Sequence, residues 1–379
     1  MPRGVTLFRV AGIPIRVDPS WLIIAGLIVW TLSVAYFPQV VPGLRPSSYW
    51  IVGSLAALGF FASVLLHELS HALVALHYRL PVRAITLFIF GGVSEITEEP
   101  QRPGIEFRMA VAGPLASFAI GATAYLIAWL ITQGGPLSIP GQLAEAGFGY
   151  LATINVLLGL FNLIPGFPLD GGRMLRSAIW RWKGDLRLAT RWASYGGKAF
   201  AAILITLGLT ALVNGAVMQG LWYGFIGLFL WQAADTAYTQ LVMSETLRGL
   251  RVGDLMSRPA IAVPADLSIT RFVDQFIFRQ RHTGYPVVVD DRPIGLITLQ
   301  QVRQVPNERW NQLTVSDIMV PLRDPLSPDD DLAVAIQRLT EAGQSRWPVA
   351  EHHRLVGVIS LSDLAVAIER APLAQRRAA

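Results

Sequence analysis

The sequence predicts a polytopic α-helical membrane domain followed by a soluble α/β domain that contains an internal repeat. The first reason is the distribution of charge: residues 1–246 contain 26 charged side chains, whereas the shorter stretch 247–379 contains 31. The whole chain is 53% hydrophobic and 15% charged, while soluble domains carry about 25% charged residues. We therefore place a membrane domain at residues 1–246 and a soluble domain at residues 247–379.

Six apolar segments in the first domain predict six transmembrane helices. Their lengths, 15 to 27 residues, lie around the roughly 20 mostly apolar residues that a spanning helix needs. The segments are Trp21–Phe37, Trp50–Leu76, Met109–Ile131, Phe148–Ile164, Ala199–Val213 and Val217–Ala234. Lys and Arg residues are concentrated in alternate loops, and the intervening loops contain only Arg45. Because positive residues mark cytoplasmic loops, we expect both termini in the cytosol and the protein in a prokaryotic plasma membrane.

A membrane-associated β-hairpin is predicted between the second and third spans. Residues 83–95 are too few to span a bilayer, are rich in β-branched and aromatic residues, and contain a glycine pair where a hairpin would turn. Non-helical backbone at membrane depth must be buried in protein or line a wet cavity. The alternative interpretation is an interfacial loop.

The second predicted span contains the pattern His67-Glu68-Leu69-Ser70-His71. Histidines at positions i and i+4 lie on one face of a helix, so both imidazoles can reach one metal ion. A glutamate between them can act as general base. Ionisable residues inside a membrane are costly and mark functional sites. The alternative is a buried polar network that joins helices.

A catalytic zinc usually takes three protein ligands, so one more is needed. Asp170 stands out because prolines and glycines break the fourth span beside it, at a depth similar to that of His67. A helix cap or a partner for Arg173 is the alternative role of this aspartate. The other free candidates in this domain are Glu95, Glu106, Glu145, Asp185, Asp235 and His77. The chain has no cysteine, which excludes thiolate ligands and a cysteine nucleophile.

The two motifs together carry a family resemblance. HELSH at residues 67–71, followed by NLIPGFPLDGG at residues 162–172, resembles the site-2 protease family of intramembrane zinc metalloproteases. That family pairs H-E-x-x-H with N-x-x-P-x-x-x-x-D-G. The resemblance covers roughly residues 1–240, including the segment Gly113–Ser117 of the third span.

The resemblance implies His67, His71 and Asp170 as the ligands of one zinc ion, Glu68 as the general base, and Asn162 beside the scissile carbonyl. An amide donor at that place can stabilise an oxyanion. Zinc lowers the pKa of a bound water to about 7, and the glutamate takes and returns the proton.

The implied substrate is a transmembrane segment of another protein in the lipid bilayer. A helical peptide bond is shielded by its own helix, so the segment must be unwound before it is cut. The region Ile85–Val93 would offer a strand edge for pairing with the extended substrate.

The soluble domain contains two copies of a repeat of about 60 residues, at roughly 250–306 and 313–371. The copies open with the similar segments Val252–Met256 and Val315–Met319, and each alternates short apolar strands with helical stretches. The pattern resembles tandem CBS domains, whose two copies pack as one module. This resemblance implies a cytosolic regulatory domain that can form a homodimer.

CBS domains often bind an adenine nucleotide such as AMP, ADP or ATP through a Ser/Thr-x-x-Asp pattern. The second copy has Ser360 and Asp363 at these positions, whereas the first has Thr298 followed by Gln301 in place of the aspartate. The resemblance thus implies one nucleotide site at the second copy, with Thr298 as the weaker candidate. A module that binds no ligand is the alternative.

Together these features predict an intramembrane zinc metalloendopeptidase for regulated intramembrane proteolysis, with nucleotide regulation through the CBS module. A CBS-regulated transporter or channel is one alternative, but it needs paired broken helices or inverted repeats, and the sequence of the membrane domain shows one broken helix and no internal repeat. A catalytically silent membrane scaffold is the other. We expect no nucleic-acid partner, because the Trp- and Arg-rich stretch 180–192 suits an interfacial anchor.

Overall fold

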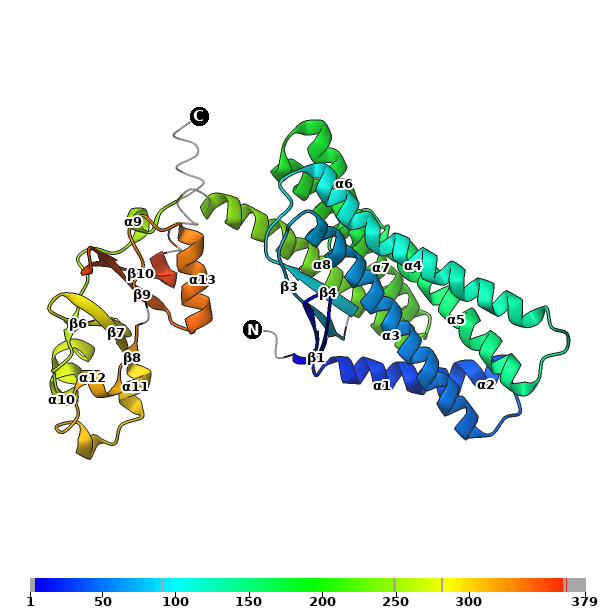
Figure 1. Cartoon of the computed structure of the whole chain (residues 1–379), viewed down its shortest axis with the longest axis horizontal. Helices are drawn as coiled ribbons and strands as arrows, with labels where there is room; N and C mark the ends of the chain where they lie inside the picture. Colours follow the sequence, from blue (N-terminus) through cyan, green and yellow to red (C-terminus); the bar gives the residue numbers. More distant parts are fainter. Residues whose placement is uncertain are drawn as a thin grey trace. The chain divides into compact units, whose positions relative to one another are not determined.

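The computed structural model describes residues 4–89, 91–247, 250–280, 282–322, 324–363 and 366. The chain divides into two compact units, Met1–Thr239 and Gln240–Ala379. The division falls within one continuous helix, α8 (Val217–Leu247) (Figure 1). Each unit is therefore described by itself.

The first unit is built mainly of helices. They are α1 (Trp21–Thr31), α2 (Phe37–Val40), α3 (Pro46–His77), α4 (Pro103–Thr132), α5 (Ile139–Asn162), α6 (Asp170–Lys183), α7 (Leu186–Val213) and the first part of α8, with a π-helical turn at Leu32–Tyr36. Among the described residues, five helical stretches are long and apolar enough to cross a membrane: Trp21–Val40, α3, α4, α5 and α7. The sixth predicted span lies on α8, which is not among these five stretches. Gln219 and Gln232 lower the mean hydropathy of this helix.

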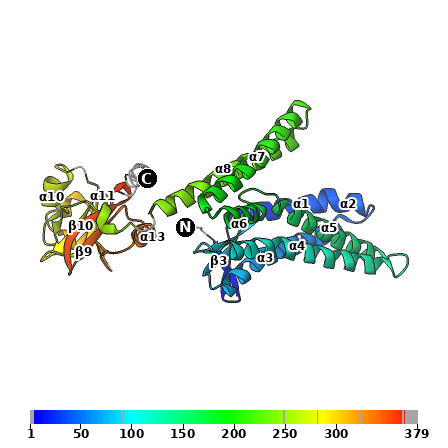
Figure 2. The ribbon, with the colours of Figure 1, turned by 90° about the horizontal axis from the view of Figure 1, so that it is seen from above.

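Small residues bring the long helices together, as is usual in membranes, where close backbone contact replaces the hydrophobic effect. A Cβ on Gly121 of α4 would lie 3.2 Å from the carbonyl oxygen of Ala152 on α5. A Cβ on Gly208 of α7 would lie 2.8 Å from the carbonyl oxygen of Gly220 on α8. Figure 2 shows α7 and α8 side by side as one pair, and α3, α4 and α5 as another group.

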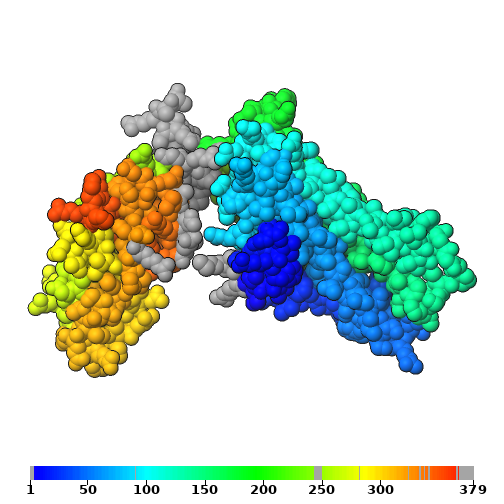
Figure 3. Space-filling model, viewed as in Figure 1, coloured from blue at the N-terminus to red at the C-terminus, as the bar shows by residue number. Residues whose placement is uncertain are grey.

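A four-stranded sheet lies beside α3. Its strands are β1 (Val5–Val10), β2 (Ile13–Val17), β3 (Val82–Phe88) and β4 (Gly91–Ile96), in the order β1-β2-β3-β4. Strands β3 and β4 form an antiparallel hairpin, and β2 runs parallel to β3. Ile13 and Ile15 pack with Ala72 of α3 and Ile85 of β3, so the N-terminal hairpin lies against α3, as the dark blue residues in Figure 3 show. Strand β4 is an edge of this sheet.

The second unit contains the two copies of the repeat. The first copy has α9 (Val252–Leu255), β5 (Val263–Pro264), α10 (Ile269–Phe272), a π-helical turn at Val273–Ile277, β6 (Gly284–Val289), β7 (Arg292–Thr298) and α11 (Leu299–Arg303), followed by a 3-10 turn at Asn307–Arg309. The second copy has α12 (Val315–Ile318), β8 (Val320–Pro321), α13 (Leu332–Ala342), β9 (Arg346–Glu351) and β10 (Arg354–Ser360). There are two apolar clusters, around Phe272 and around Leu332, and each also includes residues of the other copy: Val315 joins the first cluster and Val252 joins the second. Ser257 of the first copy bridges Val358 of β10.

Candidate active site

The two histidines of α3 lie on one buried face of the helix. His67 is 4% exposed and His71 is 8% exposed. Helix α4 can approach this face because position 113 is glycine: a Cβ there would lie 2.2 Å from Nε2 of His71 and 2.6 Å from Nε2 of His67. The close approach of α4 puts its polar groups within reach of both rings.

Helix α4 sets the orientation of both imidazoles through their Nδ1 atoms. Nδ1 of His71 is 2.6 Å from the carbonyl oxygen of Met109, which only accepts, so this nitrogen carries the proton. Nδ1 of His67 is 2.9 Å from Oγ of Ser117. A donor hydrogen bond from Nδ1 leaves the lone pair on Nε2 free, which is the usual arrangement of a metal-binding histidine.

Asp170 is the first residue of α6, and its carboxylate reaches both rings. Oδ2 of Asp170 is 3.1 Å from Nε2 of His67 and 3.2 Å from Nε2 of His71. The loop before α6 packs tightly enough that a Cβ on Gly172 would lie 2.4 Å from the backbone of Gly166. The glycines beside Asp170 therefore permit the close turn that delivers its carboxylate to α3.

The three atoms match the requirements of a zinc ion. The two Nε2 atoms are 3.2 Å apart, so with Oδ2 of Asp170 they form a nearly equilateral triangle of acceptors. Ligands bound at about 2.0–2.1 Å in tetrahedral geometry stand about 3.3 Å from one another. Three acceptor atoms that converge on one point, with no proton donor between them, are suited to a cation. If all three bind a tetrahedral zinc ion, its fourth coordination position is left open.

Glu68 lies next to this triangle and against the sheet. Its Oε2 accepts a hydrogen bond of 2.9 Å from Oγ of Ser94 on β4, and the same hydroxyl is 3.1 Å from the carbonyl oxygen of Glu68. A Cβ on Gly92 would lie 2.6 Å from Cγ of Glu68. The carboxylate is thus held between the histidine helix and the edge strand.

A buried ion pair holds α6 against α4. Nε of Arg176 donates a 2.6 Å hydrogen bond to Oε1 of Glu106, and a second nitrogen of the guanidinium also contacts this oxygen. Glu106 is 1% exposed. The guanidinium also lies 5.3 Å from the ring centre of Phe167, in the loop that leads to Asp170. Breaking a buried pair on one side costs about 3–5 kcal/mol, so this contact helps to fix the position of Asp170 at the start of α6.

The other candidate ligands have different partners. Glu106 is paired as described, Glu95 accepts from Thr86, and Asp185 caps α7. Asp235 pairs with Lys198. None of them belongs to the cluster of possible metal ligands among the described residues.

Asn162 ends α5, and its side-chain amide donates a 3.0 Å hydrogen bond to the carbonyl oxygen of Leu158 in the same helix. The structure therefore gives the amide of Asn162 a local partner, and within the described part of the chain no hydrogen bond joins it to the triangle. From the sequence, Glu106 was a candidate only as a metal ligand, and nothing indicated a role for Ser94 or Met109. These contacts join residues far apart in the chain, and no short spacing indicates them.

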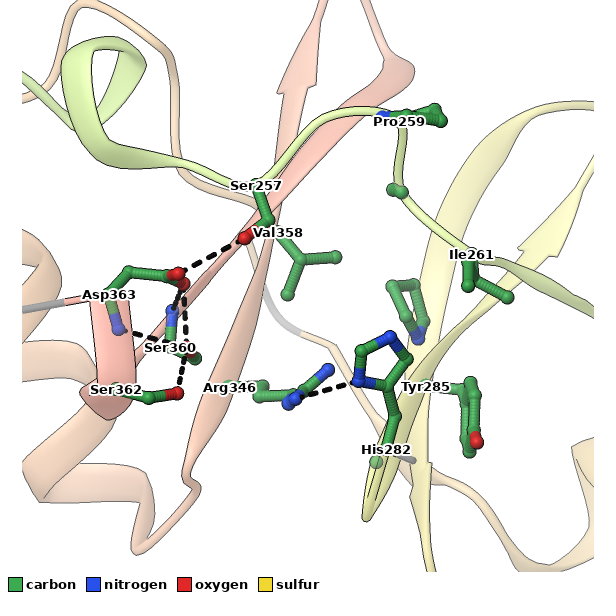
Figure 4. Close-up of a pocket in the computed structure, with 13 residues that line it drawn as sticks. Ser257, Pro259, Ile261, His282, Tyr285, Arg346, Val358, Ser360, Ser362 and Asp363 are labelled. Atoms are coloured by element: carbon green, nitrogen blue, oxygen red, sulfur yellow. Dashed lines mark hydrogen bonds between the residues drawn. The ribbon is translucent and has the colours of Figure 1, made fainter. Parts of the chain in front are cut away.

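The second unit contains a pocket of about 260 Å³ that is lined by both repeat copies (Figure 4). Ser360 and Asp363 lie in its wall. Oδ2 of Asp363 accepts from the backbone and the hydroxyl of Ser360, at 2.8 and 2.6 Å, and Oδ1 accepts from Ser257 at 3.0 Å. Thr298 is outside this wall and contacts Gln301 instead.

Comparisons with known proteins agree with the two resemblances. Residues 55–207 match the model of peptidase family M50, and residues 252–308 and 315–370 match that of the CBS domain. Rip3 of Mycobacterium tuberculosis, named as a zinc metalloprotease, is 37% identical over 379 residues, which cover 99% of this chain and 95% of Rip3.

Two further relatives come from other lineages. The protein sll0528 of Synechocystis, also named as a zinc metalloprotease, is 33% identical and covers 84% of this chain and 82% of its own length. The solved structure of the site-2 protease from Methanocaldococcus jannaschii is 30% identical, with a TM-score of 0.44, and covers 62% of this chain and 95% of that one.

Proposed function

Because this chain belongs to the site-2 type zinc metalloproteases of peptidase family M50, we propose that it cuts a transmembrane segment of a protein substrate within the bilayer. The chain is an integral membrane metalloendopeptidase that uses zinc, and it carries two CBS domains. The identity of the ligands, the mechanism and the mode of regulation are our proposals.

One observation supports the proposal above the others: the ligand triangle, Glu68 and an open strand edge lie together. Nε2 of His67, Nε2 of His71 and Oδ2 of Asp170 would hold the zinc ion. Glu68 is hydrogen-bonded to Ser94 on β4, the edge strand. A transporter needs no general base beside the three possible metal ligands. A catalytically silent scaffold needs neither the metal ligands nor the base.

The residues around the zinc site divide the chemical work. Zinc, when bound, polarises the scissile carbonyl and acidifies the attacking water. Oε2 of Glu68 takes the proton of that water and returns it to the nitrogen of the leaving amine. Ser94 orients this carboxylate. Asn162 stabilises the oxyanion. To do so, its side-chain amide must give up its hydrogen bond to the carbonyl oxygen of Leu158 and donate to the substrate instead.

Strand β4 receives the substrate in an extended form. A strand added to the edge of a sheet gains main-chain hydrogen bonds, which replace those lost when the substrate helix unwinds. The contacts of Gly92 and Ser94 with Glu68 bring the paired peptide next to the general base. The hairpin of β3 and β4 therefore lies at membrane depth, lining a wet cavity.

The topology follows from the positive residues in alternate loops. We propose six spans, with α8 as the sixth, both termini in the cytosol and the plasma membrane of a prokaryote as the location. The CBS module then lies in the cytosol, where it can meet nucleotides and pair with a second copy.

The proposal predicts cleavage of a single-span membrane protein by the purified full-length chain in detergent. Products mapped by mass spectrometry should have new ends inside the spanning segment, and a zinc chelator should stop their formation. Restored zinc should restore cleavage. Cleavage that occurs only in the soluble loops of the substrate, or that survives complete removal of metal, would contradict it.

Nucleotide regulation is the second part of the proposal. Ser360 and Asp363 line the pocket of the CBS module and are already held in a shared hydrogen-bond network. We expect an adenine nucleotide to change the cleavage rate, and we expect Asp363→Ala to remove that response. If the variant responds as the wild type does, regulation through this pocket is wrong.

A further inference from the structure

The α6–α7 corner, residues 181–195, carries a concentration of exposed positive charge. Within it, residues 181–191 contain one acidic side chain, Asp185, and four basic ones: Arg181, Lys183, Arg187 and Arg191. Asp185 is engaged as the cap of α7, where its Oδ1 accepts from the backbone of Leu188. Among the described residues, no carboxylate lies within ion-pair distance of Arg181, Lys183 or Arg191. These three exposed cations therefore face the surroundings of the protein without an internal counter-ion.

Exposed aromatic side chains lie among these cations. Trp182 is 77% exposed and Trp192 is 56% exposed, and Tyr195 is exposed as well. Nζ of Lys183 lies 4.1 Å from the ring centre of Trp182, and the guanidinium of Arg191 lies 5.5 Å from that of Tyr195. Tryptophan and tyrosine are enriched where a membrane meets water, because each has an apolar ring and a polar group that stays hydrated. Large open rings beside cations are thus suited to the headgroup region of a bilayer.

Continuity with the apolar part of α7 places this corner at the edge of the bilayer. The corner lies at one end of the group of long helices (Figure 1), and α7 is one of the stretches long and apolar enough to cross a membrane. Trp192 and Ile203 are separated by about three helical turns, so they lie on one face of α7. Ile203 is 57% exposed, as expected of a side chain that faces lipid. The face that begins at Trp192 therefore continues into the hydrocarbon region.

Helix α6 is tied to α7 at both of its ends. At the corner, only Gly184 and Asp185 connect the two helices, and Gly184 ends α6 in the left-handed conformation, with a φ of 70°. At the other end, the backbone N–H of Phe167 donates a 3.0 Å hydrogen bond to the carbonyl oxygen of Ala193 on α7. A Cβ on Gly197 would lie 1.9 Å from the carbonyl oxygen of Phe167. The basic side chains of both helices thus belong to one preformed surface, which lowers the entropic cost of binding.

We propose that the α6–α7 corner binds the headgroups of anionic phospholipids in the leaflet that it faces, and that it selects them over zwitterionic lipids. Arg181, Lys183 and Arg191 contact the headgroup phosphates, for which a guanidinium offers paired donors. Trp182 and Trp192 hold the site at headgroup depth. Basic residues gathered on an amphipathic helix beside a spanning helix are typical of surfaces that recognise anionic lipids.

Competition between lipids on the full-length protein in a neutral detergent tests this proposal. Endogenous lipid is removed, and a dansyl-labelled phosphatidylglycerol is bound and followed by energy transfer from the tryptophans. Unlabelled phosphatidylglycerol should displace it at least about 10-fold more effectively than phosphatidylcholine does, because each basic residue near an anionic lipid surface favours binding about fivefold. Water-soluble glycerol 3-phosphate should not displace it, because the proposed ligand also places its acyl chains along α7.

Two triple variants assign the preference to the corner. The corner variant combines three substitutions: Arg181→Gln, Lys183→Gln and Arg191→Gln. It should displace the labelled lipid equally well with phosphatidylglycerol and with phosphatidylcholine. The matched control removes the same charge from exposed residues of the first unit outside the corner: Arg9→Gln, Arg79→Gln and Arg102→Gln. It should keep the preference of the wild type. All six positions are on the surface, so both variants should fold, which circular dichroism checks.

Three results would overturn the proposal. The first is equal displacement by phosphatidylglycerol and phosphatidylcholine from the folded wild type. The second is a preference that persists in the corner variant, or an equal loss in both triple variants, which would show a general effect of net charge. The third is displacement by glycerol 3-phosphate, which would indicate a site for a soluble phosphate instead of a lipid. None of these measurements uses cleavage, so they stand apart from the proposed protease activity.

Discussion

Glu68→Gln is expected to reduce the cleavage rate by about 10²- to 10⁴-fold, the range for loss of a general acid–base catalyst. The amide keeps the shape of the side chain and can still contact Ser94, but it cannot accept a proton from the attacking water. Because Glu68 is not part of the triangle of possible metal ligands, the variant should retain zinc. The measurement is the initial cleavage rate, together with metal content on the same preparation.

Glu95→Gln is the matched control for this variant. Glu95 lies on β4 near the site but contacts Thr86 and Arg16, so its neutralisation should leave both cleavage and zinc nearly unchanged. Wild-type cleavage by Glu68→Gln would contradict the assignment of the base. Loss of zinc from this variant would instead indicate that Glu68 is a ligand.

Gly113→Ala is expected to weaken zinc binding by at least about 10- to 100-fold, the range for disturbed outer contacts of metal ligands. The added Cβ would lie 2.2 Å from Nε2 of His71 and 2.6 Å from Nε2 of His67. Neither imidazole ring can turn away at low energetic cost, because Met109 and Ser117, which lie on α4 together with Gly113, hold the Nδ1 atoms of the two rings. Competition with a chromophoric chelator would measure the affinity.

Gly104→Ala provides the comparison within α4. A Cβ at this position meets no atom within 4 Å, and alanine is favoured over glycine in a helix by about 1 kcal/mol. This variant should bind zinc as the wild type does. Equal zinc affinity in both glycine variants would show that α4 does not approach the histidines as described.

The local geometry around the candidate site follows from short sequence patterns. The spacing of His67 and His71 placed them on one helix face because helical periodicity alone decides that. The glycine- and proline-rich stretch before Asp170 indicated a break in the helix, and the structure has α5 end at Asn162 and α6 begin at Asp170. The resemblances to site-2 proteases and CBS domains are confirmed by the comparisons.

Contacts between distant segments could not be predicted in this way. The N-terminal strands β1 and β2 were missed because β2 finds its parallel partner β3 about 70 residues further on. Helix α7 begins at Leu186, earlier than the predicted span at Ala199, because Asp185 caps it and accepts from the backbone of Leu188. Apolar periodicity does not register such a polar first turn. The pairing of Glu106 with Arg176 likewise depends on how α4 and α6 meet.

Metal content is the most direct test of the central claim that His67, His71 and Asp170 bind one catalytic zinc. Elemental analysis of the purified, folded full-length protein should find about one zinc per chain, and His71→Ala and Asp170→Ala should each lose it. His77→Ala and Asp235→Ala, which alter the same residue types outside the cluster, should keep it. A folded wild type that takes up no zinc when supplied, or full zinc in both cluster variants, would contradict the account.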